Sequence, residues 1–289
     1  MPPTAVTKRL TLAGAAAVLT AACSPLSMFA TLSPKDPAAF VGRGEAYGVG
    51  PRQRLDVYAP RGAKGQAPVA VFFYGGSWDS GRRQDYNWVG RALASRGFVT
   101  IVADYRIYPE VRYPGFLEDG AQAVKWASDN ARRYGGDPDR IVLAGHSAGA
   151  YNAVMLGLDG RYLKAVGVDP THVKAVAGLA GPYDFLPFTD PIAKRIFGDA
   201  ADPPATQPLA HVTKNSPAAF LATGDADTMV YPRNTTALAR RLREAGVPVE
   251  ERHYPRVDHV RILLALSRPL RGGAPVLDEM SAFLREHAD

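Results

Sequence analysis

Cysteine is almost absent from this chain of 289 residues, in which Cys23 is the single example. An intramolecular disulfide is therefore impossible, and a metal centre built on several cysteine ligands is excluded. The sequence also lacks an H-E-x-x-H motif and a P-loop, the short patterns that indicate a zinc site or a nucleotide phosphate site. We therefore expect a protein that requires no metal and no cofactor.

A concentrated charge of one sign is missing as well. The formal net charge is +6 at pH 7, but basic and acidic residues are interspersed, apart from short runs such as Arg240-Arg241. Nucleic-acid binding needs a basic stripe or face, so we expect no nucleic-acid partner. Apolar residues make up 46% and charged residues 21%, a globular composition that excludes a disordered chain or a polytopic membrane protein.

An apolar stretch at the N-terminus runs from Leu10 to Ala22, directly after the cationic pair Lys8-Arg9. The stretch is shorter than the roughly 20 apolar residues of a membrane-spanning helix. A cationic start, a short apolar segment and small residues at its end are the layout of a secretory signal. The sequence therefore predicts a signal peptide over residues 1–22 and export of the protein.

Cys23 follows this stretch directly. The segment Leu19 to Cys23 resembles a bacterial lipoprotein box, in which the cysteine is lipidated, although such boxes usually have Leu where Thr20 stands. The alternative is cleavage by ordinary signal peptidase, with Cys23 incidental. We expect lipidation at Cys23 and a location on the periplasmic face of the bacterial envelope. Residues 23–44, which carry Pro and Ser, are expected to tether the anchor to a catalytic domain over 45–289.

Short apolar runs alternate with helical periodicity over the rest of the chain. The expected strands are 55–58, 69–73, 98–103, 141–144, 173–179, 218–223 and 249–254, and the expected helices are 116–133, 148–158, 233–245 and 275–287. This alternation predicts an α/β fold with a mostly parallel sheet covered by helices on both faces. Residues 181–217 are rich in proline and have little periodicity, so we expect an excursion over the active site.

The motif that carries chemistry is Gly145-His146-Ser147-Ala148-Gly149, a G-x-S-x-G sequence between an expected strand and an expected helix. A sharp strand-to-helix turn lifts such a serine above the edge of the sheet, and the glycines remove side chains that would clash there. The N–H of Ala148 lies at a helix N-terminus, where an oxyanion is favoured. Ser147 is thus a candidate nucleophile.

A nucleophilic serine needs a base and an acid that orients the base. Asp225 and Asp227 both follow the expected strand 218–223, and His259 follows the strand 249–254. The carboxyl ends of parallel strands are where such sites form. His253 is the competing base, but it lies within its strand. The remaining candidates are interpreted as ordinary surface or interior histidines; they are His146, His172 and His211.

A second oxyanion donor is expected from the loop that follows the strand 69–73. This loop reads Tyr74-Gly75-Gly76-Ser77-Trp78, and its glycines allow the backbone to approach a substrate oxygen. Around the two motifs stand further stretches of distinctive sequence: 104–110, 113–119, 137–141, and Gly224 with Asp227 and Val230.

Taken in order, these stretches resemble the α/β-hydrolase superfamily, and within it the esterases with an HGG-type oxyanion loop: the hormone-sensitive-lipase-like, acetyl-esterase-like and kynurenine-formamidase-like branches. The resemblance implies an α/β-hydrolase fold. It further implies that Ser147 is the nucleophile, Asp227 the acid and His259 the base. Backbone donors are implied at Gly76, Ser77 and Ala148.

One residue departs from the family pattern, because Tyr74 stands where the loop usually opens with His. The form Gly-Gly-x-Trp is more similar to the formamidase and feruloyl-esterase-like branches. We expect hydrolysis of small-molecule carboxylic esters, short-chain or aromatic, through an acyl-enzyme. The alternatives are an arylformamidase-type amidase with the same residues, and a ligand-binding lipoprotein on a hydrolase fold. Residues 24–50 and 181–217 are expected to shape the pocket. Candidate aromatic lining residues are Trp78, Trp88, Tyr183, Phe185 and Phe188, although each one taken singly is expected more often in the core than in a pocket.

Overall fold

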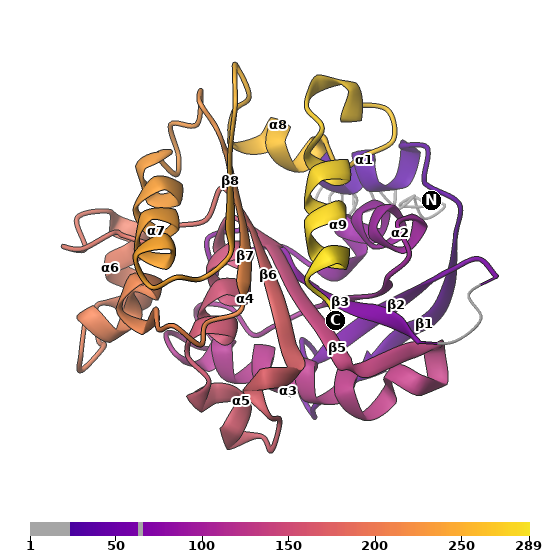
Figure 1. The fold of residues 1–289 in the computed structure, drawn as a ribbon, viewed down its shortest axis with the longest axis horizontal. Coiled ribbons are helices and arrows are strands. Elements are labelled where there is room, and N and C mark those ends of the chain that lie inside the picture. Colours follow the sequence, from indigo (N-terminus) through magenta and orange to yellow (C-terminus); the bar gives the residue numbers. More distant parts are fainter. Residues whose placement is uncertain (1–23, 63–65) are drawn as a thin grey trace, which may run out of the picture.

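A central sheet of eight strands organises the molecule (Figure 1), seen in a computed structural model that describes residues 24–62 and 66–289. The strand order is β1-β2-β4-β3-β5-β6-β7-β8. The strands span Ala38–Ala46 (β1), Arg54–Pro60 (β2), Ala67–Phe73 (β3), Val99–Ala103 (β4), Gly136–His146 (β5), Val173–Leu179 (β6), Ala218–Gly224 (β7) and Val249–Tyr254 (β8). The pairs β1–β2 and β2–β4 are antiparallel, and all pairs from β4 to β8 are parallel.

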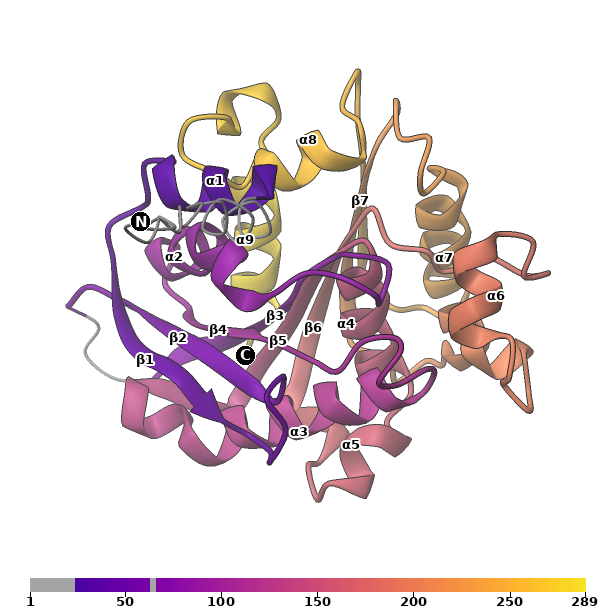
Figure 2. The same cartoon turned by 180° about the vertical axis from the view of Figure 1, so that it is seen from behind.

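Helices cover both faces of this sheet, as the two opposite views show (Figures 1 and 2). The α-helices span Pro25–Leu32 (α1), Asn87–Ser95 (α2), Gly115–Asn130 (α3), Ala148–Leu158 (α4), Arg161–Ala165 (α5), Pro191–Phe197 (α6), Arg233–Glu244 (α7), His259–Leu264 (α8) and Val276–Glu286 (α9). Helices α2 and α9 pack on one face, and α3, α4 and α7 pack on the other. The predicted α/β fold is therefore confirmed.

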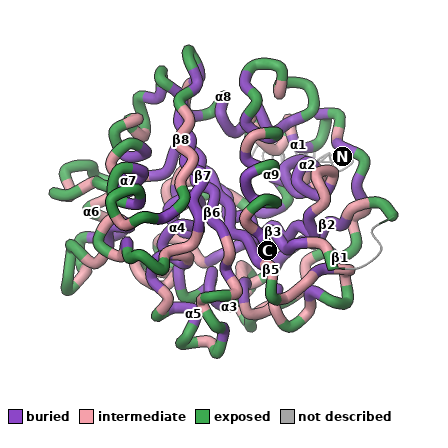
Figure 3. Tube along the Cα trace, in the orientation of Figure 1, coloured by how far each residue is buried: buried purple, intermediate pink, exposed green. Residues whose placement is uncertain are grey.

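The core lies along the inner strands of the sheet, most of whose residues are buried, while the outer faces of the helices are exposed (Figure 3). In β3, every residue after Ala67 is buried, and β7 is buried throughout. A parallel sheet covered on both faces leaves no strand face to water, so its strands read as unbroken apolar runs. That property is why these strands could be predicted from the sequence. Among the described residues, no helix has the length and apolar character to span a bilayer.

The tether expected over residues 23–44 is wrong for the part of it that the structure describes. That stretch contains α1 and the start of β1, both packed on the domain. Ser24 is the N-cap of α1, with its Oγ accepting the N–H of Ser27 at 3.1 Å, and Pro25 begins the helix. Ser and Pro are favoured at these two positions, so the residues taken for a tether are a helix start. The expected signal peptide and Cys23 lie outside the described residues.

The excursion expected over residues 181–217 contains the helix α6 and two short 3₁₀ turns, 204–206 and 208–211. Each of these three elements has proline in its first turn, where the missing N–H has no helical partner to lose. Three further helices were not predicted: α2, α5 and α8. Helix α8 begins at His259, which the sequence alone assigned to a loop.

Candidate active site

Four segments follow the carboxyl ends of neighbouring parallel strands and meet at one edge of the sheet. The loop 74–78 follows β3, Ser147 follows β5, Asp227 follows β7, and His259 follows β8. Strands β3 and β5 pair directly, as do β7 and β8, which brings segments far apart in the sequence together. Open parallel sheets bind ligands at this edge.

The turn at Ser147 has the strained backbone that the motif predicts. Ser147 has φ 55° and ψ −124°, a region that L-residues rarely occupy. A Cβ on Gly145 would lie 2.2 Å from the carbonyl oxygen of Gly149, and a Cβ on Gly149 would lie 2.0 Å from that of Phe73. Both contacts are impossible, so glycine is required on each side of the serine. Helix α4 starts at the next residue.

Three of the predicted residues form one hydrogen-bonded chain. The Nε2 of His259 lies 2.9 Å from the Oγ of Ser147, and its Nδ1 lies 2.7 Å from the Oδ2 of Asp227. The carboxylate can only accept, so Nδ1–H donates to Asp227 and Nε2 is free to accept from the serine hydroxyl. The arrangement allows His259 to take the serine proton as the oxygen attacks an electrophile.

The carboxylate of Asp227 is buried and held by several donors. Its Oδ1 accepts the N–H groups of Met229 and Val230, each at 2.9 Å. Burial by itself raises the pKa of Asp227, but the hydrogen bonds from His259 and from the two N–H groups outweigh it and hold the pKa below its ordinary value. Asp227 is therefore ionised beside the imidazole and can stabilise its charged form.

The choice between the two aspartates is visible in the loops after β7 and β8. The N–H of Ala226 donates to the carbonyl of Val257 at 3.0 Å, which fixes the loop of Asp227 against the loop of His259. A Cβ on Gly224 would lie 2.0 Å from that same carbonyl oxygen, so glycine permits the approach. Asp225 instead is exposed and lies 3.4 Å from the imidazole of His253, the competing base. The two alternatives thus pair with each other outside the site.

His146, interpreted from the sequence as an ordinary surface or interior histidine, is buried and contacts the catalytic candidate His259. Its Nε2 lies 2.8 Å from the carbonyl oxygen of His259, to which it donates, and the two rings lie 4.8 Å apart. Burial, and then the neighbouring His259, lower the pKa of His146 to about 3. His146 is thus a neutral support for His259. The sequence offered no sign of this contact, because the two residues are brought together only by the fold.

The predicted oxyanion donors lie on either side of Ser147. Ala148 is the first residue of α4, and the first N–H groups of a helix have no partner within it. Gly76 has φ 131° and Ser77 has φ 53°, and Ser77 lines both cavities that adjoin Ser147. The indole Nε1–H of Trp78 donates to the Oδ1 of Asn152 on α4 at 3.0 Å, which fixes the loop to that helix. Asn152 was not predicted.

Tyr74, at the position usually taken by His, is fully buried and braces the loop. Its hydroxyl donates to the Oδ1 of Asp104 at 2.8 Å and accepts from Arg52 at 3.0 Å. Its ring stacks between those of Tyr86 and Tyr105, at 5.2 and 4.9 Å. Burial and the nearby Asp104 raise its pKa well above the ordinary value, so the hydroxyl stays a donor. Tyr74 is therefore accommodated at this position by hydrogen bonds to its hydroxyl and by stacking of its ring.

A cavity of about 760 Å³ lies beside Ser147, within the usual size range of ligand sites. Residues 182–197 supply much of its wall, as expected of the excursion. Of the five predicted aromatic residues, Trp78 and Phe185 line it, together with Phe197, which was not predicted. The other three candidates, Trp88, Tyr183 and Phe188, do not line it. Trp88 and Tyr183 are buried in the core instead, and Phe188 stacks on Phe197.

Metal ligands are not grouped anywhere in the part of the chain that the structure describes: no three or more His, Cys, Asp or Glu residues gather there to hold an ion.

The sheet order, the strained serine turn and the Ser147–His259–Asp227 chain define the class of serine hydrolases with an α/β-hydrolase fold. A family model, BD-FAE, matches residues 55–242, more than half of the chain. The protein therefore belongs to the BD-FAE family.

The chain is similar in sequence to esterases from plants, fungi and bacteria. A probable isoprenylcysteine alpha-carbonyl methylesterase from Oryza sativa is 31% identical over 83% of this chain and 61% of its own length. Esterase LipC from Mycobacterium tuberculosis is 32% identical over 68% of this chain and 54% of its own. Versiconal hemiacetal acetate esterase from Dothistroma septosporum is 30% identical over 70% and 69%. The chain thus spans less than two thirds of the first two relatives.

Solved structures share the fold at low sequence identity. Esterase B from Lactobacillus rhamnosis superposes with a TM-score of 0.77 at 20% identity, over 91% of this chain and 92% of that one. Thermogutta terrifontis esterase 2, phosphonylated by sarin, superposes with a TM-score of 0.73 at 22% identity, over 88% and 96%. These likenesses establish the fold.

Proposed function

We propose that this protein is a serine hydrolase that cleaves small-molecule carboxylic esters, with an aromatic or short aliphatic acyl group, through an acyl-enzyme. The observation that carries the proposal is the hydrogen-bonded chain from Ser147 through His259 to Asp227, with distances of 2.9 and 2.7 Å. Membership of a family whose named relatives are esterases supports the same reaction.

In the first half of the reaction, the Oγ of Ser147 attacks the ester carbonyl and its proton passes to the Nε2 of His259. Asp227 holds the imidazole in the required tautomer and stabilises its positive charge. The protonated Nε2 then delivers the proton to the leaving alcohol, and an acyl group remains on Ser147. In the second half, a water molecule attacks the acyl carbon while it gives a proton to the Nε2 of His259. The imidazolium then returns this proton to the Oγ of Ser147 as the acid leaves, which restores the free serine.

The reaction also requires hydrogen-bond donors that stabilise the oxyanion of the tetrahedral intermediate. The N–H groups of Gly76, Ser77 and Ala148 are the proposed donors, one from the start of α4 and two from the loop after β3. Removal of one such donor in other hydrolases costs about 3 kcal/mol of transition-state stabilisation. The bracing of this loop by Tyr74 and Trp78 supports the assignment, because preorganised donors need not reorient during the reaction.

The test is a series of p-nitrophenyl esters, from acetate to long acyl chains and including an aromatic acyl group. We expect turnover on short and aromatic esters that falls for long chains and that a serine-directed organophosphate abolishes. Intact-mass analysis should place one phosphonyl group on Ser147. A folded protein that turns over no ester and gains no phosphonyl mass contradicts the proposal, and turnover of N-formyl arylamines alone would favour the amidase alternative.

We further propose that Cys23 is lipidated and anchors the protein to the periplasmic face of the bacterial envelope. The segment from Leu19 to Cys23 and the cationic start before it support this proposal. Membrane-extracted protein should carry acyl mass on an N-terminal Cys23. Cys23→Ser should move the protein from the membrane fraction to the soluble fraction with its esterase activity intact. An unmodified mature chain that begins at another residue contradicts lipidation.

A further inference from the structure

A second cavity, of about 480 Å³, adjoins Ser147 on the side away from residues 182–197. The two cavities share four lining residues: Ser77, Ser147, Met229 and His259. An ester carbonyl held at Ser147 therefore has space for one of its two substituents on each side. The second cavity falls within the size range of small-molecule sites.

The two cavities differ in chemistry. The larger one has charged side chains on its wall, among them Asp184, Asp190 and Arg233. Among residues 24–62 and 66–289, no Asp, Glu, Lys or Arg lines the second cavity. Its apolar lining comes mainly from two helices, with Leu26 and Phe29 on α1 and Val260, Leu263 and Leu264 on α8. An apolar substituent is therefore favoured here, and a charged one is disfavoured because the described wall offers it no partner of opposite charge.

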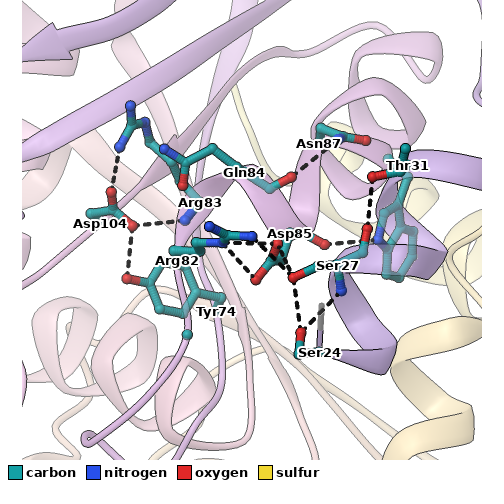
Figure 4. A network of polar contacts seen from close by, with 12 residues as sticks. Ser24, Ser27, Thr31, Tyr74, Arg82, Arg83, Gln84, Asp85, Asn87 and Asp104 are labelled. Carbon is teal, nitrogen blue, oxygen red and sulfur yellow. Dashed lines mark hydrogen bonds and ion pairs between the residues drawn. The ribbon is translucent and has the colours of Figure 1, made fainter. Parts of the chain in front are cut away.

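Helix α1 is held in this position by polar contacts with the segment that precedes α2 (Figure 4). The Oγ of Ser27 donates to Asp85 at 2.8 Å, and Arg82 contacts both Asp85 and Ser27 at 3.1 Å. The ring of Phe29 meets Trp88 edge-on at 5.3 Å. Because these contacts hold both the polar and the apolar side of α1, the helix is a fixed wall of the cavity.

The same segment is linked to the loop beside the nucleophile. Arg83 follows Arg82 directly, and its backbone N–H donates to the Oδ1 of Asp104 at 2.7 Å. That carboxylate oxygen also accepts the hydroxyl of Tyr74, which opens the loop after β3 (Figure 4). Helix α1 and the proposed oxyanion loop are thus fixed to one network, so the cavity and the reacting atoms keep their relative positions.

We propose that α1 and α8 form a subsite for the apolar substituent of the ester, and that substrates carry an aliphatic or aromatic group on this side and a larger, more polar group on the other. This inference rests on the proposed ester hydrolysis at Ser147. Ser24 also lines the cavity, directly after the residue at which lipidation is proposed, so a segment that the sequence indicated as a tether takes part in substrate selection.

The test compares two tryptophan variants of the full chain on α1. Leu26→Trp fills the cavity, whereas Met28→Trp changes a residue of the same helix that is 51% exposed and absent from the cavity wall. Each is assayed with p-nitrophenyl acetate and hexanoate, and with ethyl and hexyl acetate, so that both halves of the ester are varied. Leu264→Trp, on the opposite wall, is a second filling variant that does not depend on the folding of α1.

We expect Leu26→Trp and Leu264→Trp to lower the ratio of long-chain to short-chain kcat/KM about tenfold in one of the two series, since steric exclusion of a few methylenes has effects of this order. Met28→Trp should leave both ratios unchanged. Ratios unchanged in both filling variants overturn the subsite, as does an equal loss on every ester. A wild-type chain that hydrolyses no ester and does not react with organophosphate would instead contradict the proposed ester hydrolysis at Ser147. The failure of the subsite and the failure of the proposed function are therefore distinguishable.

Discussion

Ser147→Ala is expected to lower kcat for every ester substrate by about 10⁴-fold or more, because it removes the atom that forms the acyl-enzyme. The Oγ of Ser147 makes the 2.9 Å contact with His259 and lies at the meeting point of both cavities. No other side chain on the cavity walls has a hydroxyl in hydrogen-bond contact with that imidazole, within the residues that the structure describes.

Folding should survive this change. Alanine can occupy the turn at φ 55° about as well as serine, since both have a Cβ and both lack the freedom of glycine. The thermal midpoint and the near-ultraviolet circular dichroism of the variant should therefore match those of the wild type. Steady-state rates are compared on one batch of p-nitrophenyl acetate, with Ser77→Ala as a second serine variant of the same site. A folded Ser147→Ala protein that retains organophosphate-sensitive turnover would show that another residue is the nucleophile.

The inner strands that position the site were predictable from the sequence because of their burial. Strand β6, buried at all but one position, coincides with the predicted range 173–179, and the serine turn follows from the glycines on either side of Ser147. The edge strand β8 also coincides with its predicted range, 249–254, although most of its residues are only partly buried. Fully covered strands must be apolar along their whole length, which leaves a clear signal. For this reason the fold could be predicted, together with the positions of Ser147, Asp227 and His259 at the edge of the sheet.

The walls of the site were not predictable to the same degree. Helix α1 has eight residues, too few for periodicity to emerge, and its cap residues resemble those of a linker. Trp78 faces a cavity whereas Trp88 is buried beneath α1, and this difference depends on packing between segments far apart in the chain. A hydrophobic residue has the same sequence signal in a core and in a pocket.

The second large effect on activity is expected from replacing Asp227, the acid of the proposed triad. Asp227→Asn should lower kcat/KM by about 10³- to 10⁴-fold, because an amide at this position offers an N–H where the imidazole needs an acceptor. His259 would then hold its proton on the Nε2 that faces Ser147, and the serine would have no base. The N–H groups of Met229 and Val230 can still reach the amide oxygen, so the loop should keep its structure.

Asp225→Asn is the matched control, since it makes the same chemical change two residues away. Asp225 is exposed and contacts His253 rather than His259, so its loss should change kcat/KM by less than about twofold. The rate of organophosphate inactivation should fall in Asp227→Asn together with turnover, which a purely structural role of this residue would not cause. The reverse order of the two variants would identify Asp225 as the acid and would require the loop after β7 to rearrange in solution.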